Sequence, residues 1–215
     1  MEQKDIENLR QDYAAASLSE KDVDANPIKQ FDKWFNDAIN AKVHEPNAMT
    51  LATATTDGRP SARIVLLKGF SDDGFKFYTN YLSRKGKELA KNPNAALVFF
   101  WGDMERQIRI EGTIEKLDKW YSEKYFHSRP KASQISAVAS PQSREIESRE
   151  ALEEHIVKLE AEFGDGEIPK PSHWGGYIVK PRMIEFWQGR RSRLHDRIVY
   201  KKVDNKNWKI VRLAP

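Results

Sequence analysis

The chain has 215 residues, of which 39% are hydrophobic and 11% aromatic, so it can build a sizeable core in one large domain. It contains no cysteine, which excludes disulfides, thiolate metal sites and a cysteine nucleophile, and which favours a cytoplasmic location. The net charge of +4 permits an anionic partner without requiring a polyanion, and no apolar run reaches the ~20 residues that span a bilayer, so we expect a soluble protein with no membrane partner.

The N-terminal part is expected to be an arm followed by a helix. Residues 1–26 are polar and lack the apolar run of a signal peptide, and we interpret them as a partly mobile arm with weak helical character. Asn26 and Pro27 then provide a helix cap and first turn. Apolar side chains follow at helical spacing, and they are Ile28, Phe31, Trp34, Phe35, Ala38, Ile39 and Val43.

From Ala48 the hydrophobic period changes to two, which indicates strands. Residues 48–70 predict a hairpin with a turn at Asp57-Gly58, and 72–81 predict a further turn and strand. A short helix follows over 83–92 and ends before Pro93. Residues 95–103 and 105–118 predict a second hairpin.

The C-terminal half mixes helices and strands. Residues 119–143 predict two short helices, and 148–163 an amphipathic helix that ends at Gly164. Three more strands are expected over 173–189, 193–202 and 207–215. Hairpins in succession, with helices between them and no linker or repeat, predict a single α+β domain over 27–215 built on an antiparallel barrel.

Standard catalytic motifs are missing from the sequence. It holds no phosphate-binding loop, nucleophile elbow or HExxH motif, and its histidines lack ligand spacing, so we predict no metal site. What remains is a set of loops and element ends rich in cations.

Two of these segments surround predicted strands and a helix start. Arg63 and Lys68 bracket an apolar strand, and their odd spacing predicts opposite faces that serve different anions, unless they are simply charged strand ends. Arg84 and Lys85 occupy the first turn of a helix, where cations are unfavourable without an anion. The helix start therefore predicts a phosphate site.

Two further segments combine cations with hydroxyl or aromatic groups. "KYFHSRPKAS" offers Tyr125, Arg129 and Ser133 to a phosphate monoester. In "IEFWQGRRSRLHDR", three cationic side chains alternate along an expected strand beside Trp187, as walls for a flat heterocycle. These three are Arg193, His195 and Arg197.

The same segments carry a resemblance to the pyridoxine/pyridoxamine 5′-phosphate oxidases. "RIVLLK", "FYTNYLSRKGKELAKNP", "ERQIRIEG", "YFHSRPKASQI", "SPQS", "HWGGY", "RLHDR" and "WKIVRLAP" are similar to family segments, in the family's order. The resemblance runs from about Leu9 to Pro215. It implies an antiparallel split β-barrel with peripheral helices that binds FMN, in a homodimer with FMN at the interface.

The resemblance also implies site residues. Its FMN contacts would be Arg63, Ile64, Val65, Leu66, Leu67, Lys68, Tyr78, Thr79, Arg84, Lys85, Gln107, Gln142, Ser143, Trp187 and Arg197. Its substrate contacts would be Arg10, Tyr13, Lys68, Tyr125, Arg129, Ser133, Arg193, Leu194 and His195. Arg193 and His195 would orient the substrate and handle protons, and Arg190 and Arg191 receive no role beyond surface charge.

The implied reaction is the oxidation of pyridoxamine or pyridoxine 5′-phosphate at C4′, which loses a hydride to flavin N5. Dioxygen then takes the electrons and becomes hydrogen peroxide, and pyridoxal 5′-phosphate is the product. Two alternatives remain open: an FMN-binding barrel protein with another substrate, and a basic module that grips RNA or single-stranded DNA. A purely structural protein would leave Arg84 and Lys85 at the helix start unexplained.

Overall fold

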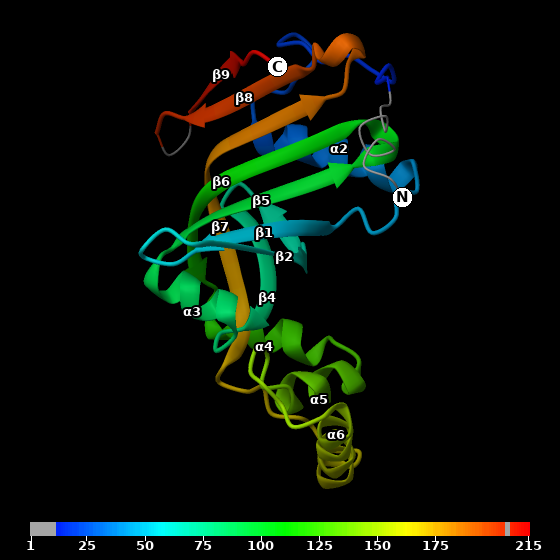
Figure 1. Ribbon diagram of the computed structural model, residues 1–215, viewed down its shortest axis with the longest axis vertical. Helices are drawn as coiled ribbons and strands as arrows, with labels where there is room; N and C mark the ends of the chain where they lie inside the picture. Colours follow the sequence, from blue (N-terminus) through cyan, green and yellow to red (C-terminus); the bar gives the residue numbers. More distant parts are fainter. Residues whose placement is uncertain (1–11, 205–206) are drawn as a thin grey trace, which may run out of the picture. The chain divides into compact units, whose positions relative to one another are not determined.

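The computed structural model describes residues 12–204 and 207–215, and the chain divides into two compact units. The first unit comprises the chain up to Met49 together with 97–111 and 181–215. The second comprises 50–96 and 112–180. The units interleave along the sequence. Three strands labelled in Figure 1, β5 (Asn94–Trp101), β6 (Arg106–Lys116) and β7 (Trp174–Gln188), each have residues in both units. The expected division into an arm and one domain stays a prediction.

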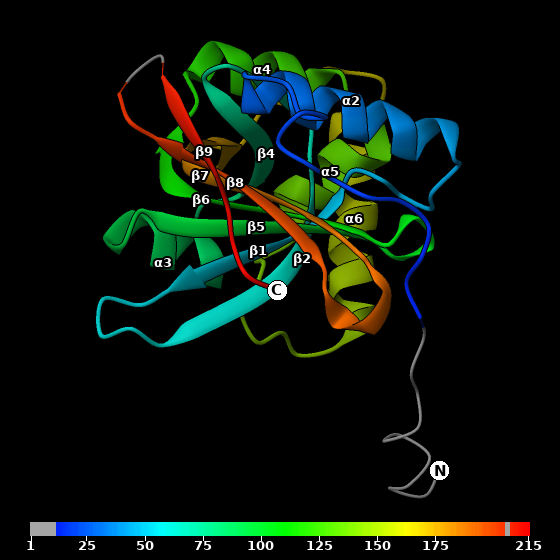
Figure 2. The ribbon, with the colours of Figure 1, turned by 90° about the horizontal axis from the view of Figure 1, so that it is seen from above.

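Hydrogen-bonded strands form one sheet among the described residues. Its strands are β1 (Ala48–Ala54), β2 (Pro60–Leu66), β3 (Gly69–Ser71), β4 (Gly74–Asn80), β5 (Asn94–Trp101), β6 (Arg106–Lys116), β7 (Trp174–Gln188), β8 (Asp196–Lys202) and β9 (Trp208–Arg212). They pair in the order β2-β1-β5-β6-β7-β4-β3, with β8 on β7 and β9 on β8. The pairs β4–β7, β7–β8 and β8–β9 are antiparallel, and Figure 2 shows β8 and β9 side by side.

The described residues also form five α-helices. They are α2 (Pro27–Asn40), α3 (Arg84–Lys91), α4 (Lys119–His127), α5 (Lys131–Ala139) and α6 (Arg149–Phe163), with short 3-10 turns η1 (Gly102–Met104) and η2 (Arg191–Arg193). An antiparallel sheet with peripheral helices confirms the α+β split-barrel prediction. None of the helices in the described ranges combines the length and the apolar character that crossing a bilayer requires.

In the first unit, α2 packs one apolar face into the core. Asn26 caps it as predicted, because its side chain accepts hydrogen bonds from the Ile28 and Lys29 amides. Phe31 meets Phe99 with ring centroids 5.3 Å apart, and both side chains are fully buried. Burial of an aromatic side chain of this size contributes about 2 kcal/mol to stability. The predicted stripe ends early, since α2 stops at Asn40 and leaves Ile39 48% exposed.

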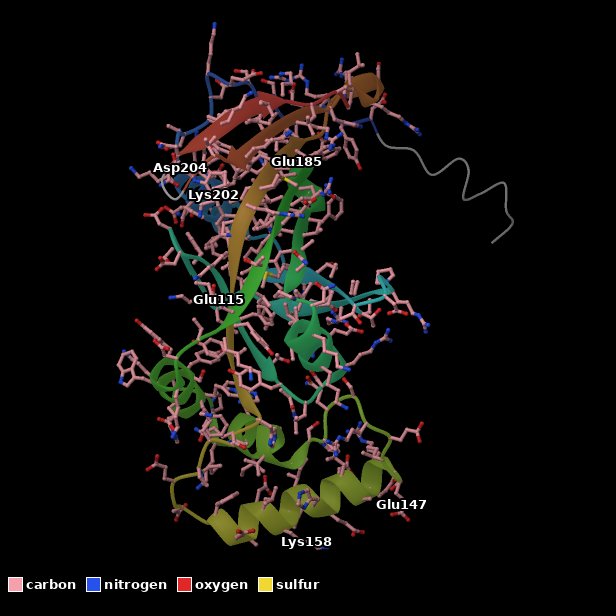
Figure 3. The ribbon with its side chains drawn as sticks, turned by 90° about the vertical axis from the view of Figure 1, so that its left-hand side faces the viewer. Glu115, Glu147, Lys158, Glu185, Lys202 and Asp204 are labelled. Carbon is pink, nitrogen blue, oxygen red and sulfur yellow. The ribbon has the colours of Figure 1, made fainter. Side chains whose placement is uncertain are left out.

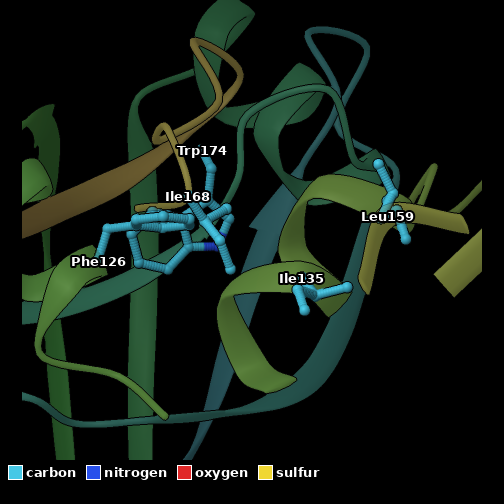
Figure 4. Packing of buried hydrophobic residues seen from close by; sticks show 6 residues of the cluster. Phe126, Ile135, Leu159, Ile168 and Trp174 are labelled. Atoms are coloured by element: carbon cyan, nitrogen blue, oxygen red, sulfur yellow. The ribbon is translucent and has the colours of Figure 1, made fainter. Parts of the chain in front are cut away.

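In the second unit, α4, α5 and α6 share a separate apolar core. Its buried members are Phe126, Ile135, Ala139, Leu159, Ile168 and Trp174 (Figure 4). The α6 residues predicted to point inward take part, with Leu159 buried and three others half-buried against the cluster. The helix ends at Gly164, whose φ of 46° lies in the left-handed region that glycine adopts freely.

One predicted strand begins later than expected. Residues 193–195 were expected to be extended, but β8 starts only at Asp196. Ser192 and Arg193 have φ values of 56° and 59°, and two consecutive left-handed residues cannot continue a strand. The predicted alternation of Arg193, His195 and Arg197 along one strand face is therefore wrong.

Candidate functional site

The second unit contains a pocket of about 510 Å³ that gathers most of the predicted residues of that unit. The predicted residues that line it are Arg63, Ile64, Val65, Leu66, Lys68, Tyr78, Thr79, Lys85, Tyr125, Arg129, Ser133 and Gln142. Asn80, Pro130 and Trp174 complete the lining and were not predicted. Residues from β2, β4, α3, α4, α5 and β7 thus meet, although Arg63 and Trp174 are 111 positions apart in the sequence.

Arg63 and Lys68 line the same pocket, so their expected placement on opposite faces is wrong. That they serve different anions stays a prediction. Alternation does hold within β2, where Arg63 is half-buried and Ile64 is 65% exposed. The strand ends at Leu66, however, and the chain turns toward β3, with the Lys68 amide donating to the Lys76 carbonyl at 2.8 Å. The alternation of side chains between the two faces of a strand therefore does not extend to Lys68.

A buried carboxylate holds Arg63 in place. Arg63 donates to the hydroxyls of Thr53 and Ser61, at 2.6 Å each, and to the Leu51 carbonyl at 3.2 Å. Both hydroxyls in turn donate to one oxygen of Glu88, at 2.5 Å and 2.6 Å. Since a guanidinium only donates and a carboxylate only accepts, the direction of every bond in this relay is fixed.

Glu88 also links a second arginine to the network. Its other carboxylate oxygen accepts from Arg84 Nε at 2.9 Å. Burial alone would raise the pKa of Glu88, but hydrogen bonds from Ser61, Thr53 and Arg84, with the charge of Arg63, lower that pKa to about 2. Sequence reasoning missed Glu88, Thr53 and Ser61. Arg84 itself is predominantly exposed and is not among the pocket-lining residues.

Lys85 enters the pocket from the start of α3. Its Nζ donates to Gln142 Oε1 at 2.8 Å and to the Thr79 hydroxyl at 3.2 Å. Burial, with the nearby charge of Arg63, lowers the pKa of Lys85 to about 8. Burial and the charge of Arg63 disfavour the protonated form of Lys85. A dianionic phosphate bound beside Lys85 would stabilise that protonated form.

Aromatic rings and an unsatisfied arginine form another part of the lining. Tyr78 stacks on Tyr125 with centroids 3.9 Å apart, and on Trp174 at 5.7 Å. The Arg129 guanidinium lies 4.8 Å from the centre of the Trp174 ring. Its Nη1 is buried and finds no hydrogen-bond acceptor among the described residues, and burial lowers the pKa of Arg129. An unpaired buried guanidinium N–H fits an anionic ligand.

In the first unit, Trp187, His195 and Tyr13 form a ring cluster. Trp187 and His195 have centroids 4.6 Å apart, and Tyr13 meets each of them edge-on at 5.8 Å. The Arg190 amide donates to His195 Nδ1 at 3.1 Å. Because Nδ1 accepts this bond, neutral His195 carries its hydrogen on Nε2.

Arg197 is already engaged by protein groups. It donates to both oxygens of Glu185, at 2.8 Å and 3.0 Å, and to the Ala214 carbonyl at 3.0 Å. Glu185 is fully buried on β7, beside β8 (Figure 3). Its hydrogen bonds raise the pKa of Arg197.

The remaining predicted residues are scattered over the described chain. Gln107 lies half-buried on β6 in the first unit, and Arg193 and Leu194 are exposed there. In the second unit, Leu67 is buried and Ser143 is exposed with a φ of 68°. Arg10 lies outside the described residues.

Comparisons with known proteins agree with this architecture. The family profile "Pyridoxamine 5′-phosphate oxidase" matches residues 35–162, and "Pyridoxine 5′-phosphate oxidase C-terminal dimerisation region" matches 174–215. The pyridoxine/pyridoxamine 5′-phosphate oxidase of Salinibacter ruber is 58% identical over 98% of this chain and 99% of its own length. The protein of the same name from Nostoc punctiforme is 55% identical over 99% of both chains.

Two solved structures share the fold. PhzG from Burkholderia lata, in complex with tetrahydrophenazine-1-carboxylic acid, has a TM-score of 0.87 and 34% identity, covering 94% of this chain and all of its own. An FMN-binding protein from Nostoc punctiforme has a TM-score of 0.70 and 17% identity, covering 88% of this chain and 98% of its own. The family matches confirm the expected oxidoreductase and its cofactor, FMN. The chain belongs to the pyridoxamine 5′-phosphate oxidase family.

Proposed function

We propose that the chain oxidises pyridoxamine 5′-phosphate and pyridoxine 5′-phosphate to pyridoxal 5′-phosphate. The alcohol gives up two hydrogens, which convert dioxygen to hydrogen peroxide; with the amine, water also enters and ammonia leaves. The observation that carries this proposal is the second unit's pocket, whose lining combines four cationic side chains with a stack of aromatic rings. The names of the Salinibacter and Nostoc relatives support the same substrates.

The pocket offers donors for the phosphate of FMN. Arg63, Lys85 and the Thr79 hydroxyl are the groups we assign to it, and Glu88 keeps Arg63 aligned. Bound FMN supplies the two-electron acceptor that the oxidation requires. The cationic groups are fixed by protein contacts before any ligand arrives, so binding costs little side-chain entropy.

A second group of donors suits the phosphate of the substrate. Arg129, with its unpaired Nη1, is the strongest, and the hydroxyls of Tyr125 and Ser133 and the Lys68 ammonium add further donors. A charge-assisted hydrogen bond to a phosphate oxygen is worth about 2 kcal/mol. A phosphate oxygen that accepts from Arg129 Nη1 would offset the free-energy cost of burying this N–H group without a partner.

His195 and Arg193 are the residues we assign to the substrate ring and C4′. Because the hydrogen of neutral His195 lies on Nε2, this nitrogen acts as a hydrogen-bond donor toward the substrate rather than as a base. The amine substrate can lose its own proton to water, so the reaction does not need a strong protein base. Arg193 contributes charge and orientation from the strained turn at Ser192.

We also propose a cytoplasmic homodimer. The match to a dimerisation region over 174–215 supports it, and so do two exposed apolar side chains in the pocket's lining. Ile64 is 65% exposed and Leu66 is 36% exposed, on a strand at the end of the sheet order. An exposed apolar edge strand is a liability unless another surface covers it.

The test is a visible absorption spectrum of the purified protein, before and after anaerobic addition of pyridoxamine 5′-phosphate. We expect a yellow protein that bleaches, recovers its colour in air and yields pyridoxal 5′-phosphate. A yellow protein that stays oxidised would reject the substrate and make tetrahydrophenazine-1-carboxylic acid, the compound bound by PhzG, the next ligand to test. A colourless protein that FMN cannot reconstitute would contradict the proposal.

A further inference from the structure

Residues 13–18, which we name the strap, are held to the first unit through their backbone. The amides of Ala14 and Ala15 donate to the two carboxylate oxygens of Glu105, at 3.2 Å and 2.9 Å. The strap has no helix or strand of its own. Side chains from distant parts of the sequence therefore determine where it lies.

Glu105 has an unusual backbone for its residue type. Its φ of 52° and ψ of 38° are left-handed, a conformation that costs a residue with a Cβ about 1 kcal/mol or more. Fully buried Gln188 holds this turn, because its Nε2 donates to the carbonyls of Met104 and Glu105, at 3.2 Å each. Glycine would adopt this turn without strain. The glutamate side chain is therefore present at this position in spite of the conformational free energy that it costs.

Gly189 provides the space into which Tyr13 fits. Its amide donates to the Glu105 carbonyl at 2.7 Å. A Cβ on Gly189 would lie 2.8 Å from Tyr13 Cγ and 2.9 Å from the Cβ atoms of both Tyr13 and Glu105. Contacts that short do not occur in folded proteins, so any larger residue would displace Tyr13 or Glu105.

A second attachment lies at the far end of the strap. Leu18 is buried, its amide donates to Asp196 Oδ2 at 3.0 Å, and its carbonyl accepts from Arg212 Nη2 at 3.0 Å. Arg212 also binds Asp196 Oδ1 at 2.7 Å, so the two attachment groups hold each other. With both ends fixed, the Tyr13 ring keeps its edge contacts with Trp187 and His195.

We propose that Glu105 and Gly189 form a seat that positions Tyr13 against Trp187 and His195, and that both are positioning residues for the oxidation. This inference rests on the proposed function for its kinetic consequence, and on the contacts above for its structural one. Tyr13 is an expected substrate contact. Loss of the seat should therefore weaken substrate binding and leave FMN in place.

The main variants are Glu105→Gly and Gly189→Ala in the full chain. Glu105→Gly removes the carboxylate while keeping a residue that accepts the left-handed turn, so the fold should survive. Lys42→Gly is its matched control, since Lys42 is exposed and also left-handed, with a φ of 56°. Gly69→Ala is the control for Gly189→Ala, because a Cβ there meets only one side-chain atom, at 3.9 Å.

Hydrogen exchange of the peptide that covers residues 12–20 is the first readout, measured on FMN-loaded protein. Both seat variants should exchange at least about tenfold faster there, which is the effect of losing about 1.4 kcal/mol of protection. The controls should exchange as the wild type does. Unchanged exchange in both seat variants would overturn the proposal, and if Gly189→Ala does not fold, Glu105→Gly still decides.

Steady-state kinetics are the second readout. We expect KM for pyridoxamine 5′-phosphate to rise about tenfold in each seat variant, with kcat and FMN content little changed. Tyr13→Ala should raise KM to a similar extent, and adding Gly189→Ala to it should have no further effect. Fast exchange with normal KM would overturn the positioning role. A wild type that does not oxidise this substrate would contradict the proposed function alone, because the exchange data still test the seat.

Discussion

The pocket of the second unit and the turn at Ser192 in the first unit present their cations in opposite ways. Arg63 is bound on several sides by a buried relay on regular strands, whereas Arg193 is exposed on two consecutive left-handed residues. The first arrangement suits a group that must hold a ligand tightly. The second suits a group that must take a particular orientation near a reacting atom and can change it. The difference suggests that cofactor retention and turnover depend on separate regions.

The largest effects are expected when each of the two arginines is replaced by alanine. Arg193→Ala should lower kcat about a hundredfold, because orientation of the substrate is lost, and leave FMN content near normal. Arg63→Ala should weaken FMN binding about a hundredfold, by removing hydrogen bonds between charged groups. Flavin fluorescence titration and turnover assays measure both. Equal effects of the two substitutions on flavin content would rule out the division of roles.

A smaller effect is expected when the carboxylate behind Arg63 is neutralised. Glu88→Gln should weaken FMN binding about tenfold and lower the free energy of unfolding of the ligand-free protein by about 3 kcal/mol, because half-buried Arg63 loses its buried counter-charge. Riboflavin, which lacks the phosphate, is the control ligand. If its affinity falls as much as that of FMN, Glu88 acts on the whole pocket and not through the phosphate.

The pH dependence of the pocket sharpens the comparison further. The pKa of Lys85 is about 8 in the folded protein and 10.5 as an ordinary lysine, so between these values the unfolded chain binds more protons. In ligand-free protein, the contribution of Lys85 to stability should therefore rise with pH through this window. FMN binding should change in the opposite direction, because phosphate prefers the charged lysine, and its dissociation constant should increase above about pH 8.

Fluorescence titrations with FMN from about pH 7 to about pH 9.5 measure this second change. Lys85→Met should bind FMN more weakly and with a flatter pH profile. A wild-type dissociation constant that stays level across this range would show that Lys85 does not contact the phosphate.

The smallest effect is expected at the strained turn of the first unit. Ser192→Gly removes a left-handed residue with a Cβ, so it should change the free energy of unfolding by no more than about 1 kcal/mol. It should also lower kcat a few-fold, because Arg193 becomes less well oriented. Chemical denaturation and turnover assays check the two parts, and Lys42→Gly controls for a left-handed glycine elsewhere. An unchanged kcat would mean that the strain has no role in the reaction.

Local sequence signals were sufficient where a short segment determines its own structure. Asn26 and Ser83 begin α2 and α3 as expected, and Gly164 ends α6, because caps act within one turn of a helix. The order of hairpins likewise predicted an antiparallel barrel. Those features required no knowledge of distant residues.

Sequence-based prediction failed where residues far apart in the sequence determine the local structure or the contacts of a side chain. Nothing near Glu88 in the sequence shows that it accepts from Thr53 and Ser61, which lie on another hairpin. Glu105 and Arg193 have left-handed backbones although neither is a glycine or an asparagine, the residue types that usually indicate such a turn. The sequence therefore did not predict these turns. Cation-rich segments of the sequence indicated residues such as Arg63, Lys85 and Arg129, and the resemblance to a family added the others. The structure adds which of these residues share a pocket.

The bond between Arg197 and Ala214 has a practical consequence for anyone who produces this protein. The Ala214 carbonyl accepts from Arg197, whose own carbonyl accepts the Leu213 amide at 3.0 Å. A purification tag fused after Pro215 would begin one residue from this contact. Recombinant material with a C-terminal tag should therefore be compared with tag-free protein before its flavin content or turnover is taken as native.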